Sequence, residues 1–335
     1  MARAVSGIEP LVAMEIRRSG LGVVRGLRHR EVWFEAPSQA DLLSLRTADD
    51  VLLAAAVVDG IGHGRSALRR LARAARELDV GRLTPSGLGV EVSASFVGRR
   101  NYTRFEIEDA VGAELARPLR VPYHSRREGG RPPRAARSWR VTIEGDQAVI
   151  AVRVADRPLH RRAYKTASIR GTLHPPVAAA MAQLARLGEA RTVLDPCCGA
   201  GTTLIEAGAL AGAPGVRLAG FDHDPAALAA ATANAATDAG KPFAWAVADA
   251  GRIPMAGGSV DRVLVNPPWG RQVPPRGSLT RDLGPLWREV RRVLAPDGLA
   301  VALVHDGIPR GFAVEEAVQV SLMGQHPVIT VLSPR

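Results

Sequence analysis

Residues 263–270, Val-Leu-Val-Asn-Pro-Pro-Trp-Gly, join a buried-strand pattern to a rigid corner. Two prolines hold their φ angles near about −65° and remove two backbone donors. The Asn266 amide oxygen and the Pro267 carbonyl can therefore both accept hydrogen bonds from one planar amino group, and Trp269 offers a face for stacking. Two fixed acceptors would raise electron density on a weakly nucleophilic aromatic amine and aim its lone pair. We predict that Asn266, Pro267 and Trp269 are catalytic; the alternative is a rigid surface turn.

A glycine-rich turn at 195–203, Asp-Pro-Cys-Cys-Gly-Ala-Gly-Thr-Thr, follows an earlier predicted strand. Gly199 and Gly201 let the backbone pass close to a ligand. Asp222 and Asp249 end the next two predicted strands, where they can accept hydrogen bonds from ribose hydroxyls and from an adenine amino group, respectively. Each aspartate alone is more typical of a solvated turn or a helix cap. The ordered set, with Asn266 at the fourth strand end, predicts a nucleoside pocket at the carboxyl edge of a parallel sheet.

The segments LDPCCGAGTTLIEA, GFDHDP, VAD and VNPPWG, in this order, resemble class I S-adenosylmethionine-dependent methyltransferases. The Asn-Pro-Pro-aromatic motif is similar to that of members that methylate amino groups. Residues 159–185 resemble the junction of THUMP-domain RNA guanine-N2 methyltransferases, and the chain before them loosely resembles their ferredoxin-like and THUMP domains. Trp269 stands where most members have tyrosine, and its indole ring should still stack on a base.

That resemblance implies S-adenosylmethionine as cofactor, the N2 amino group of a guanosine in tRNA as substrate, and contact with the 3′ end of the tRNA. It places Asp195 near the methionine part of the cofactor. His174 is either a cofactor contact or a residue that starts a helix. The predicted cofactor site is Asp195, Cys198, Gly199, Gly201, Thr202, Asp222, Asp249, Ala250 and His174. The predicted RNA site is Arg99, Arg100, Arg104, Arg126, Arg127, Arg161, Arg162 and Lys165.

Charge is distributed unevenly along the 335 residues. The net charge is +11, and residues 1–170 hold 30 Lys and Arg against 19 Asp and Glu, whereas residues 171–335 hold 14 of each. A basic half beside a neutral half indicates a polyanion-binding module. A GC-rich genome explains why arginine replaces lysine, but not this asymmetry. The basic loop at 126–137 has no counterpart that we can match in the family, so its RNA contact is left open.

The order of predicted elements gives the fold class, α/β. A helix is expected at 174–188. After it, predicted strands alternate with helices, and an antiparallel pair of strands follows; the alternating strands lie at 191–195, 216–222, 243–249, 260–266 and 299–305. This order predicts a mostly parallel, seven-stranded Rossmann-like sheet. Before it, we expect a helix at 10–20, a strand at 31–36, a helix at 38–48 capped by Ser38, a capping box of Thr103 and Glu106, and a hairpin turning at Gly145. The glycines at 60–64 are interpreted as a plain turn before a basic helix.

Four parts are therefore expected: a ferredoxin-like domain at 1–84, a THUMP domain at 85–165, a linker helix at 166–190 and a methyltransferase domain at 191–335. Cys197 and Cys198 are adjacent, with no His or Cys at metal spacing, so we expect no metal. No apolar run reaches the roughly 18 residues of a membrane span, and the start lacks a signal-peptide pattern. A cytoplasmic monomer is expected.

Other functions remain open on the sequence alone. The same chemistry could act on guanine N2 of ribosomal RNA, on adenine N6 of DNA or on a protein glutamine, although the basic half disfavours glutamine. The chain could also be an RNA-binding protein whose methyltransferase fold is a relic. The intact set of strand-end residues disfavours that alternative.

Overall fold

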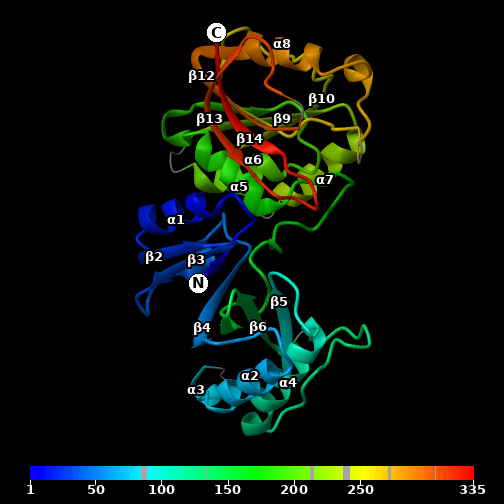
Figure 1. The fold of residues 1–335 in the computed structure, drawn as a ribbon. Helices are drawn as coiled ribbons and strands as arrows, with labels where there is room; N and C mark the ends of the chain where they lie inside the picture. The colour runs from blue at the N-terminus through cyan, green and yellow to red at the C-terminus, as the bar shows by residue number, and fades with distance from the viewer. Residues whose placement is uncertain (84–88, 134, 212–214, 237–241, 271–272, 306) are drawn as a thin grey trace. The chain divides into compact units, whose positions relative to one another are not determined.

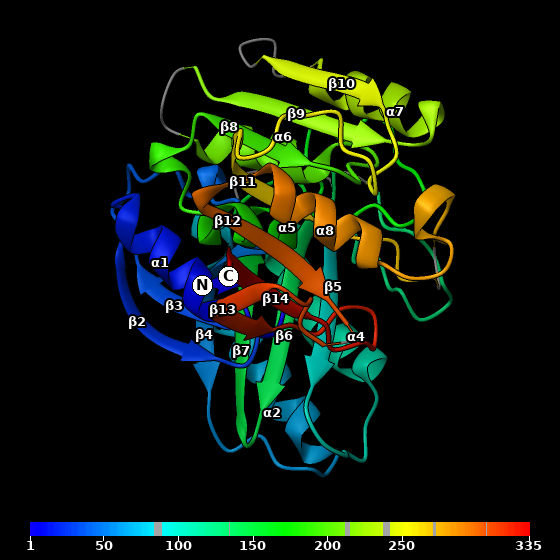
Figure 2. The same cartoon turned by 90° about the horizontal axis from the view of Figure 1, so that it is seen from above.

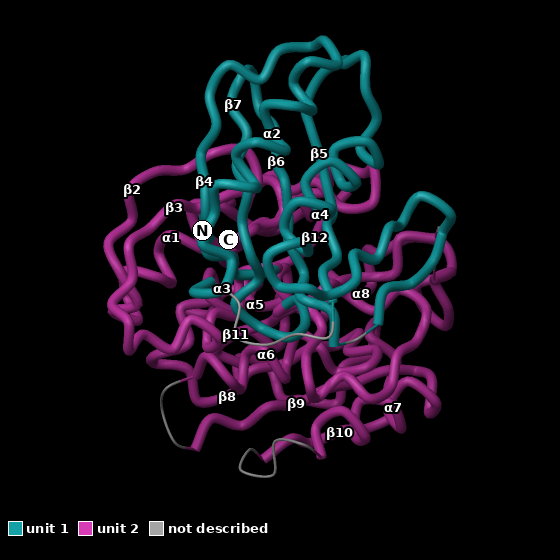
Figure 3. Tube along the Cα trace, turned by 90° about the horizontal axis from the view of Figure 1, so that it is seen from below, with its two compact units in different colours: residues 1, 50–158 teal, residues 2–49, 159–335 magenta. Residues whose placement is uncertain are grey.

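The computed structural model describes residues 1–83, 89–133, 135–211, 215–236, 242–270, 273–305 and 307–335. The chain divides into two compact units, coloured separately in Figure 3. Unit 1 comprises Met1 and residues 50–158, and unit 2 comprises residues 2–49 and 159–335. Figure 1 labels most of the helices and strands of both units.

Unit 1 is a four-stranded sheet with its helices on one face. The strand order is β4-β7-β6-β5; β4–β7 and β6–β7 are antiparallel and β5–β6 is parallel. The predicted hairpin is confirmed, with its turn at Gly145 (φ +57°). The elements are β4 (Asp50–Val58), α2 (Ser66–Arg76), α3 (Val80–Leu83), β5 (Val90–Phe96), α4 (Arg104–Leu119), β6 (Arg137–Glu144) and β7 (Gln147–Arg153).

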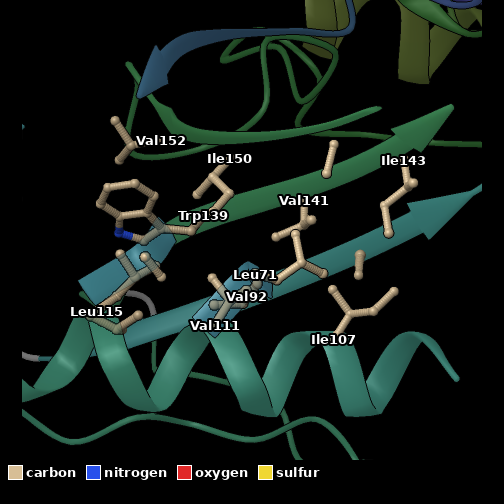
Figure 4. Packing of buried hydrophobic residues seen from close by; sticks show 14 of the residues in the cluster. Leu71, Val92, Ile107, Val111, Leu115, Trp139, Val141, Ile143, Ile150 and Val152 are labelled. Carbon is tan, nitrogen blue, oxygen red and sulfur yellow. The ribbon is translucent and has the colours of Figure 1, made fainter. Parts of the chain in front are cut away.

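Helix α4 forms one wall of the core of unit 1. Ile107, Val111 and Leu115 recur every four residues, so they share one helix face and are fully buried. Figure 4 shows this row facing the sheet, and Trp139 of β6 belongs to the same buried cluster. The capping box is confirmed at its N-terminus, because the Thr103 side chain accepts from the Glu106 amide and the Glu106 carboxylate accepts from the Thr103 amide.

Two predictions for the first half differ from the structure. Residues 50–83 were expected in the first domain, but β4 pairs with β7 and α2 packs on α4, so they share one core with residues 89–158. The expected boundary at 84/85 lies outside the described residues. The expected helix at 38–48 is wrong: only a 3-10 turn, η1 (Leu42–Ser44), forms there, and its cap is Asp41 rather than Ser38. The short polar side chains near its start favour turns over helix.

Unit 2 begins with a small antiparallel sheet and one helix. Its strand order is β2-β3-β1, and α1 packs on β2 and β3. The elements are β1 (Ala2–Arg3), α1 (Glu9–Arg18), β2 (Val23–Arg28) and β3 (Glu31–Glu35). The predicted helix at 10–20 and strand at 31–36 are thereby confirmed to within a residue or two.

The rest of unit 2 is the predicted seven-stranded sheet, in the order β10-β9-β8-β11-β12-β14-β13 (Figure 2). The first five strands run parallel, and β14 pairs antiparallel with both β12 and β13, as expected. The strands are β8 (Thr192–Asp195), β9 (Arg217–Asp222), β10 (Phe243–Val247), β11 (Val260–Val265), β12 (Leu294–Val304), β13 (Phe312–Gln319) and β14 (Val328–Pro334).

Helices cover both faces of this sheet. In Figure 1, α8 lies on one face, and α5, α6 and α7 lie on the other. Successive strand residues alternate between the faces, so Val263 and Val265 of β11 pack in the cluster with Leu286 and Val290 of α8. The helices are α5 (Pro175–Leu184), η2 (Leu187–Glu189), α6 (Thr202–Leu210), α7 (Pro225–Ala235), η3 (Gly277–Leu279) and α8 (Gly284–Val293). No helix in the described part of the chain has the length and apolarity that crossing a bilayer requires.

Candidate active site

The candidate active site lies in unit 2, where β8, β9, β10 and β11 end. These four strands are parallel neighbours in the sheet, so their carboxyl ends share one edge. Asp195 ends β8, Asp222 ends β9, Asp249 follows β10, and Asn266 follows β11. The structure therefore brings together the four side chains that the sequence placed at consecutive strand ends.

The glycine turn between β8 and α6 has the backbone that its residues predict. Gly199 (φ +52°) and Gly201 (φ +77°) both occupy the left-handed region, which L-residues with a side chain disfavour. A Cβ at Gly201 would also lie 3.0 Å from the Trp245 indole and 3.1 Å from the Ala231 Cβ. Gly201 is the N-cap of α6, so the unpaired amides of the first helical turn face the strand ends.

Asp222 is positioned by two backbone amides. Its carboxylate accepts from the Gly199 amide at 2.9 Å and from the Asp224 amide at 3.0 Å, one on each oxygen. A carboxylate offers about four lone-pair sites, so each oxygen retains capacity for one more donor. That arrangement fits a pair of ribose hydroxyls.

Asp249 accepts more hydrogen bonds than Asp222 does. It accepts from the Gly251 amide (2.9 Å), the Ser278 amide (2.9 Å) and the Ser278 hydroxyl (2.5 Å). Burial raises the pKa of this carboxyl, but the hydrogen bonds from Ser278 and Gly251 outweigh burial, and the pKa is lowered overall. Ser278 is a residue that sequence reasoning missed, because it lies in η3, far from Asp249 along the chain. An adenine amino group would use the remaining acceptor site or replace the Ser278 hydroxyl.

Asp195 is fully buried beneath the glycine turn. It accepts from the Cys197 amide at 3.0 Å and from the Thr203 hydroxyl. Burial raises its pKa to about 7, against the opposing effect of the Thr203 and Cys197 hydrogen bonds. The carboxyl therefore titrates near neutral pH, unlike an ordinary aspartate.

The adjacent cysteines are structural parts of the same turn. The Cys198 amide donates to the Phe221 carbonyl at 2.9 Å and ties the turn to β9. Burial, followed by the nearby carboxylates, raises the pKa of both thiols, so they are protonated and poor nucleophiles. This agrees with small residues that line the turn rather than with covalent catalysis.

The rigid corner after β11 leaves two polar atoms unused. The Asn266 Oδ1 and the Trp269 Nε1 are buried, and neither has a hydrogen-bond partner within the described ranges. Thr202 Oγ1, in the first turn of α6, is in the same condition. Buried polar atoms are nearly always paired, so three such atoms at one sheet edge are typical of a site that pairs with a ligand. The residues present therefore fit a nucleoside-containing cofactor and an amino group.

His305, at the end of β12, contacts Trp269 in this corner. The ring centroids are 3.7 Å apart with an interplanar angle of 65°, an edge-to-face arrangement. Sequence reasoning missed His305; its position at the end of the fifth parallel strand was the only available signal. The contact restricts the indole that was predicted to stack on a base.

The linker at 159–174 is fixed to the sheet by two buried polar groups. Asn234 of α7 accepts from the Ala167 amide (2.9 Å) and donates to the carbonyls of Ala167 and Ala200 (3.0 Å each), which joins the linker to the glycine turn. Glu206 of α6, fully buried, accepts from Arg46 Nε (2.7 Å), Arg162 Nε (2.9 Å) and the Tyr164 hydroxyl (2.9 Å). Neither residue was singled out from the sequence.

The predicted RNA residues fall into different environments. Arg99, Arg104, Arg126 and Arg161 are exposed. Arg127 is exposed but paired with Asp109, and Arg100 donates to the carbonyls of Ile61, Gly62 and Gly145. Lys165 is half-buried, which lowers its pKa. Arg162 is a correction: its side chain is 9% exposed and its donors are committed to Glu206 and to backbone carbonyls, so it is a buried structural residue.

Within the described residues, Ala250 and His174 make no hydrogen bond to the four strand-end side chains. Ala250 is buried in the core beneath α8. The His174 imidazole lies 2.5 Å from Asp49 Oδ1 and contacts the His160 ring, and His174 also precedes the two prolines that start α5. Their contact with the cofactor stays a prediction.

Comparison with known proteins decides the family. Residues 162–319 match the family model described as RMKL-like, methyltransferase domain. The tRNA (guanine(6)-N2)-methyltransferase of Thermus thermophilus is 32% identical over 79% of this chain and 78% of its own length. The chain belongs to the class I S-adenosylmethionine-dependent RNA methyltransferase family.

Two further comparisons agree with that assignment. The crystal structure of TrmN from Thermus thermophilus superimposes with a TM-score of 0.82 at 29% identity, covering 100% of this chain and 98% of TrmN. The U6 snRNA (guanine-N(2))-methyltransferase THUMPD2 of Bos taurus is 32% identical over 48% of this chain and 30% of its own length. The predicted family, α/β fold and cofactor of this methyltransferase are thereby confirmed.

Proposed function

We propose that this methyltransferase transfers a methyl group to the exocyclic N2 amino group of a guanosine in tRNA. The observation that carries the proposal is the buried Asn266 Oδ1 at the fourth strand end, which has no hydrogen-bond partner among the residues that the structure describes. An amino group is the ligand that supplies a donor to this acceptor. The relative from Thermus thermophilus, by its name a tRNA guanine-N2-methyltransferase, supports the choice of substrate.

The cofactor is held by residues at the first three strand ends. Asp222 would accept from the ribose hydroxyls and Asp249 from the adenine amino group. The turn at Gly199 and Gly201 would pass close to the cofactor, and Thr202 Oγ1 would offer a hydroxyl from the first turn of α6. Bound S-adenosylmethionine supplies a methyl group on a positively charged sulfur. Asp195, buried under the same turn, provides a carboxyl near the methionine part, as the family resemblance implies.

The corner at 266–269 holds and orients the guanine. Asn266 Oδ1 and the Pro267 carbonyl accept the two N–H groups of the amine, so its lone pair points away from both acceptors. Trp269, restricted by His305, stacks on the base after it has left its own stack. Direct transfer would form the nitrogen–carbon bond as the carbon–sulfur bond breaks, and the amine would then lose a proton to water, because alkylation lowers its pKa. No general base is needed.

Unit 1 is the proposed RNA-binding module. It carries 19 arginines against 13 Asp and Glu. Arg99, Arg104 and Arg126 are exposed on it, where they can contact phosphates. We assign the acceptor end of tRNA to this module, as the family resemblance implies. Binding should weaken steeply with salt, because each phosphate contact releases counterions.

Transfer of labelled methyl from S-adenosylmethionine tests the proposal directly. Unmodified tRNA, ribosomal RNA, DNA and protein are offered in parallel, and the labelled material is digested for nucleoside mass spectrometry. N2-methylguanosine in tRNA is expected. Label confined to ribosomal RNA, or to adenine in DNA, would keep the chemistry and replace the substrate. Cofactor binding by calorimetry without transfer to any of the four would favour a non-catalytic RNA-binding protein.

A further inference from the structure

Asp49, His160 and His174 form a cluster in unit 2 that the proposed methyl transfer does not use. One potential ligand atom from each residue lies within 4.8 Å of the other two. The three side chains come from the end of the N-terminal segment, the start of the linker and the N-cap of α5. No local sequence pattern indicates the cluster, because its members lie in separate segments.

A simple ion pair does not account for the composition of this cluster. Asp49 Oδ1 lies 2.5 Å from His174 Nε2, which one carboxylate and one imidazole would explain. His160 adds a second imidazole, with its ring centroid 5.2 Å from that of His174. Two imidazoles that face one carboxylate repel each other when both are protonated, whereas they cooperate when both are neutral and bind one cation.

His160 has the orientation that metal-bound histidines usually show. Its Nδ1 lies 3.3 Å from the Asp49 carbonyl oxygen, and its backbone amide donates to the same oxygen at 3.0 Å. A ligating imidazole commonly donates one ring N–H to a backbone carbonyl, which fixes the ring and leaves the other nitrogen for the ion. The Nδ1 contact therefore leaves the Nε2 of His160 with a lone pair for a cation.

We propose that Asp49, His160 and His174 bind one divalent transition-metal ion of the Zn²⁺ class, with an open fourth position. Two imidazoles and a carboxylate suit Zn²⁺, whereas Mg²⁺ and Ca²⁺ require oxygen ligands. This proposal departs from the prediction, made from the sequence, that the chain binds no metal. That prediction rested on the spacing around the two cysteines.

The geometry needs a small adjustment to hold the ion. With metal–ligand bonds of about 2.0–2.1 Å, a tetrahedral site separates its ligand atoms by about 3.3 Å. The contact between Asp49 Oδ1 and His174 Nε2 must then open by about 0.8 Å. His174 can rotate because its side chain is 33% exposed. Arg30 and Arg161 contribute positive charge nearby and weaken the affinity without removing any ligand.

Such an ion would connect the two points at which the chain leaves and re-enters unit 2. Asp49 is the last residue before the chain passes into unit 1, and His160 is the second residue after it returns. Binding to the folded state alone raises the melting temperature by mass action. A Zn²⁺-dependent rise is therefore expected alongside direct binding.

The test uses the full chain after removal of metals with a chelator. Zn²⁺ is titrated against a chromophoric chelator, and Co²⁺ is added separately to record its visible absorption. We expect one ion per chain and the absorption of a four- or five-coordinate Co²⁺ complex. Asp49→Asn and His160→Gln should each abolish both signals, since each removes one ligand but retains a side chain of similar size. His326→Gln is the matched control, because His326 is exposed in unit 2 and outside the cluster.

Three results would overturn the proposal. They are no stoichiometric binding by the unaltered chain, unchanged binding in both cluster variants, and equal loss in His326→Gln. Circular dichroism of each variant, compared with the unaltered chain, separates the loss of a ligand from the loss of the fold. Loss of the Co²⁺ absorption in folded Asp49→Asn then supports the metal site, and its persistence contradicts the site, whatever the result for methyl transfer.

Discussion

Replacing Asn266 with alanine should separate catalysis from stability. Asn266 Oδ1 is buried and has no partner in the described parts of the chain. In the free enzyme, a buried unpaired acceptor costs about 1–3 kcal/mol. Alanine removes that cost together with the acceptor. The variant should therefore fold as well as the unaltered enzyme or slightly better.

The same substitution should strongly lower the rate of methyl transfer, although it leaves stability unchanged or slightly raised. During transfer, the amine gains positive charge, so a fixed acceptor stabilises the transition state more than the ground state. Loss of one preorganised hydrogen-bonding group typically lowers kcat by about 10²–10³, equivalent to about 2.7–4 kcal/mol. We expect that decrease in kcat, little change in the Kd of the cofactor, and a melting temperature that is unchanged or raised by a few degrees, at about 2–4 °C per kcal/mol.

Single-turnover transfer to tRNA measures the chemical step, while calorimetry and thermal unfolding give the other two quantities. Asn266→Asp retains an acceptor and should keep measurable activity. Ser259→Ala is the matched control. Ser259 is exposed and directly precedes the first residue of β11, whereas Asn266 follows the last. Activity of Asn266→Ala within about threefold of the unaltered enzyme would refute the reasoning, since it falls far outside the expected range. A melting temperature lowered by many degrees would refute the claim that the acceptor is idle in the free enzyme.

Three further outcomes follow from the same structure. Glu206→Ala leaves the buried Arg162 without its carboxylate and should cost about 3–5 kcal/mol of unfolding free energy in urea titrations; a loss below about 1 kcal/mol would contradict the buried network. Because the pKa of Asp195 is raised to about 7, its carboxyl is neutral below that pH and cannot attract the sulfonium. Calorimetry should show S-adenosylmethionine binding about tenfold weaker at pH 6 than at pH 8, with S-adenosylhomocysteine and the Asp195→Asn variant much less affected. Trp269→Ala should lower kcat/KM by about 5- to 150-fold through the loss of about 1–3 kcal/mol of stacking, and Trp269→Tyr should restore most of it.

The methyltransferase sheet was the part of the fold most open to prediction. Strands β8, β9 and β11 are short, mainly apolar runs that end at or directly before Asp195, Asp222 and Asn266, and this local pattern sets both their length and their end. Because parallel strands present their carboxyl ends at one edge, the order of Asp195, Asp222, Asp249 and Asn266 along the chain was enough to bring them together.

The first half was less predictable, because its units are not continuous in sequence. Residues 50–83 follow the N-terminal segment along the chain, yet β4 pairs with β7, about a hundred residues away. Nothing in an apolar strand specifies which distant strand it will pair with, since the backbone hydrogen bonds are the same in each case. The short helix expected at 38–48 also failed, because its polar residues cap and turn rather than propagate a helix.

The sequence by itself determined the family, the cofactor edge and the acceptors for an amino group, because those depend on residue types next to each other or at successive strand ends. Only the tertiary structure decided which polar groups are already paired. It paired Asp249 with Ser278 and buried Arg162 against Glu206, and it left Asn266 Oδ1 without a partner among the described residues. It also brought Asp49 to His160 and His174. The physical reason is that burial and hydrogen bonding between distant segments arise from packing, which local sequence does not encode.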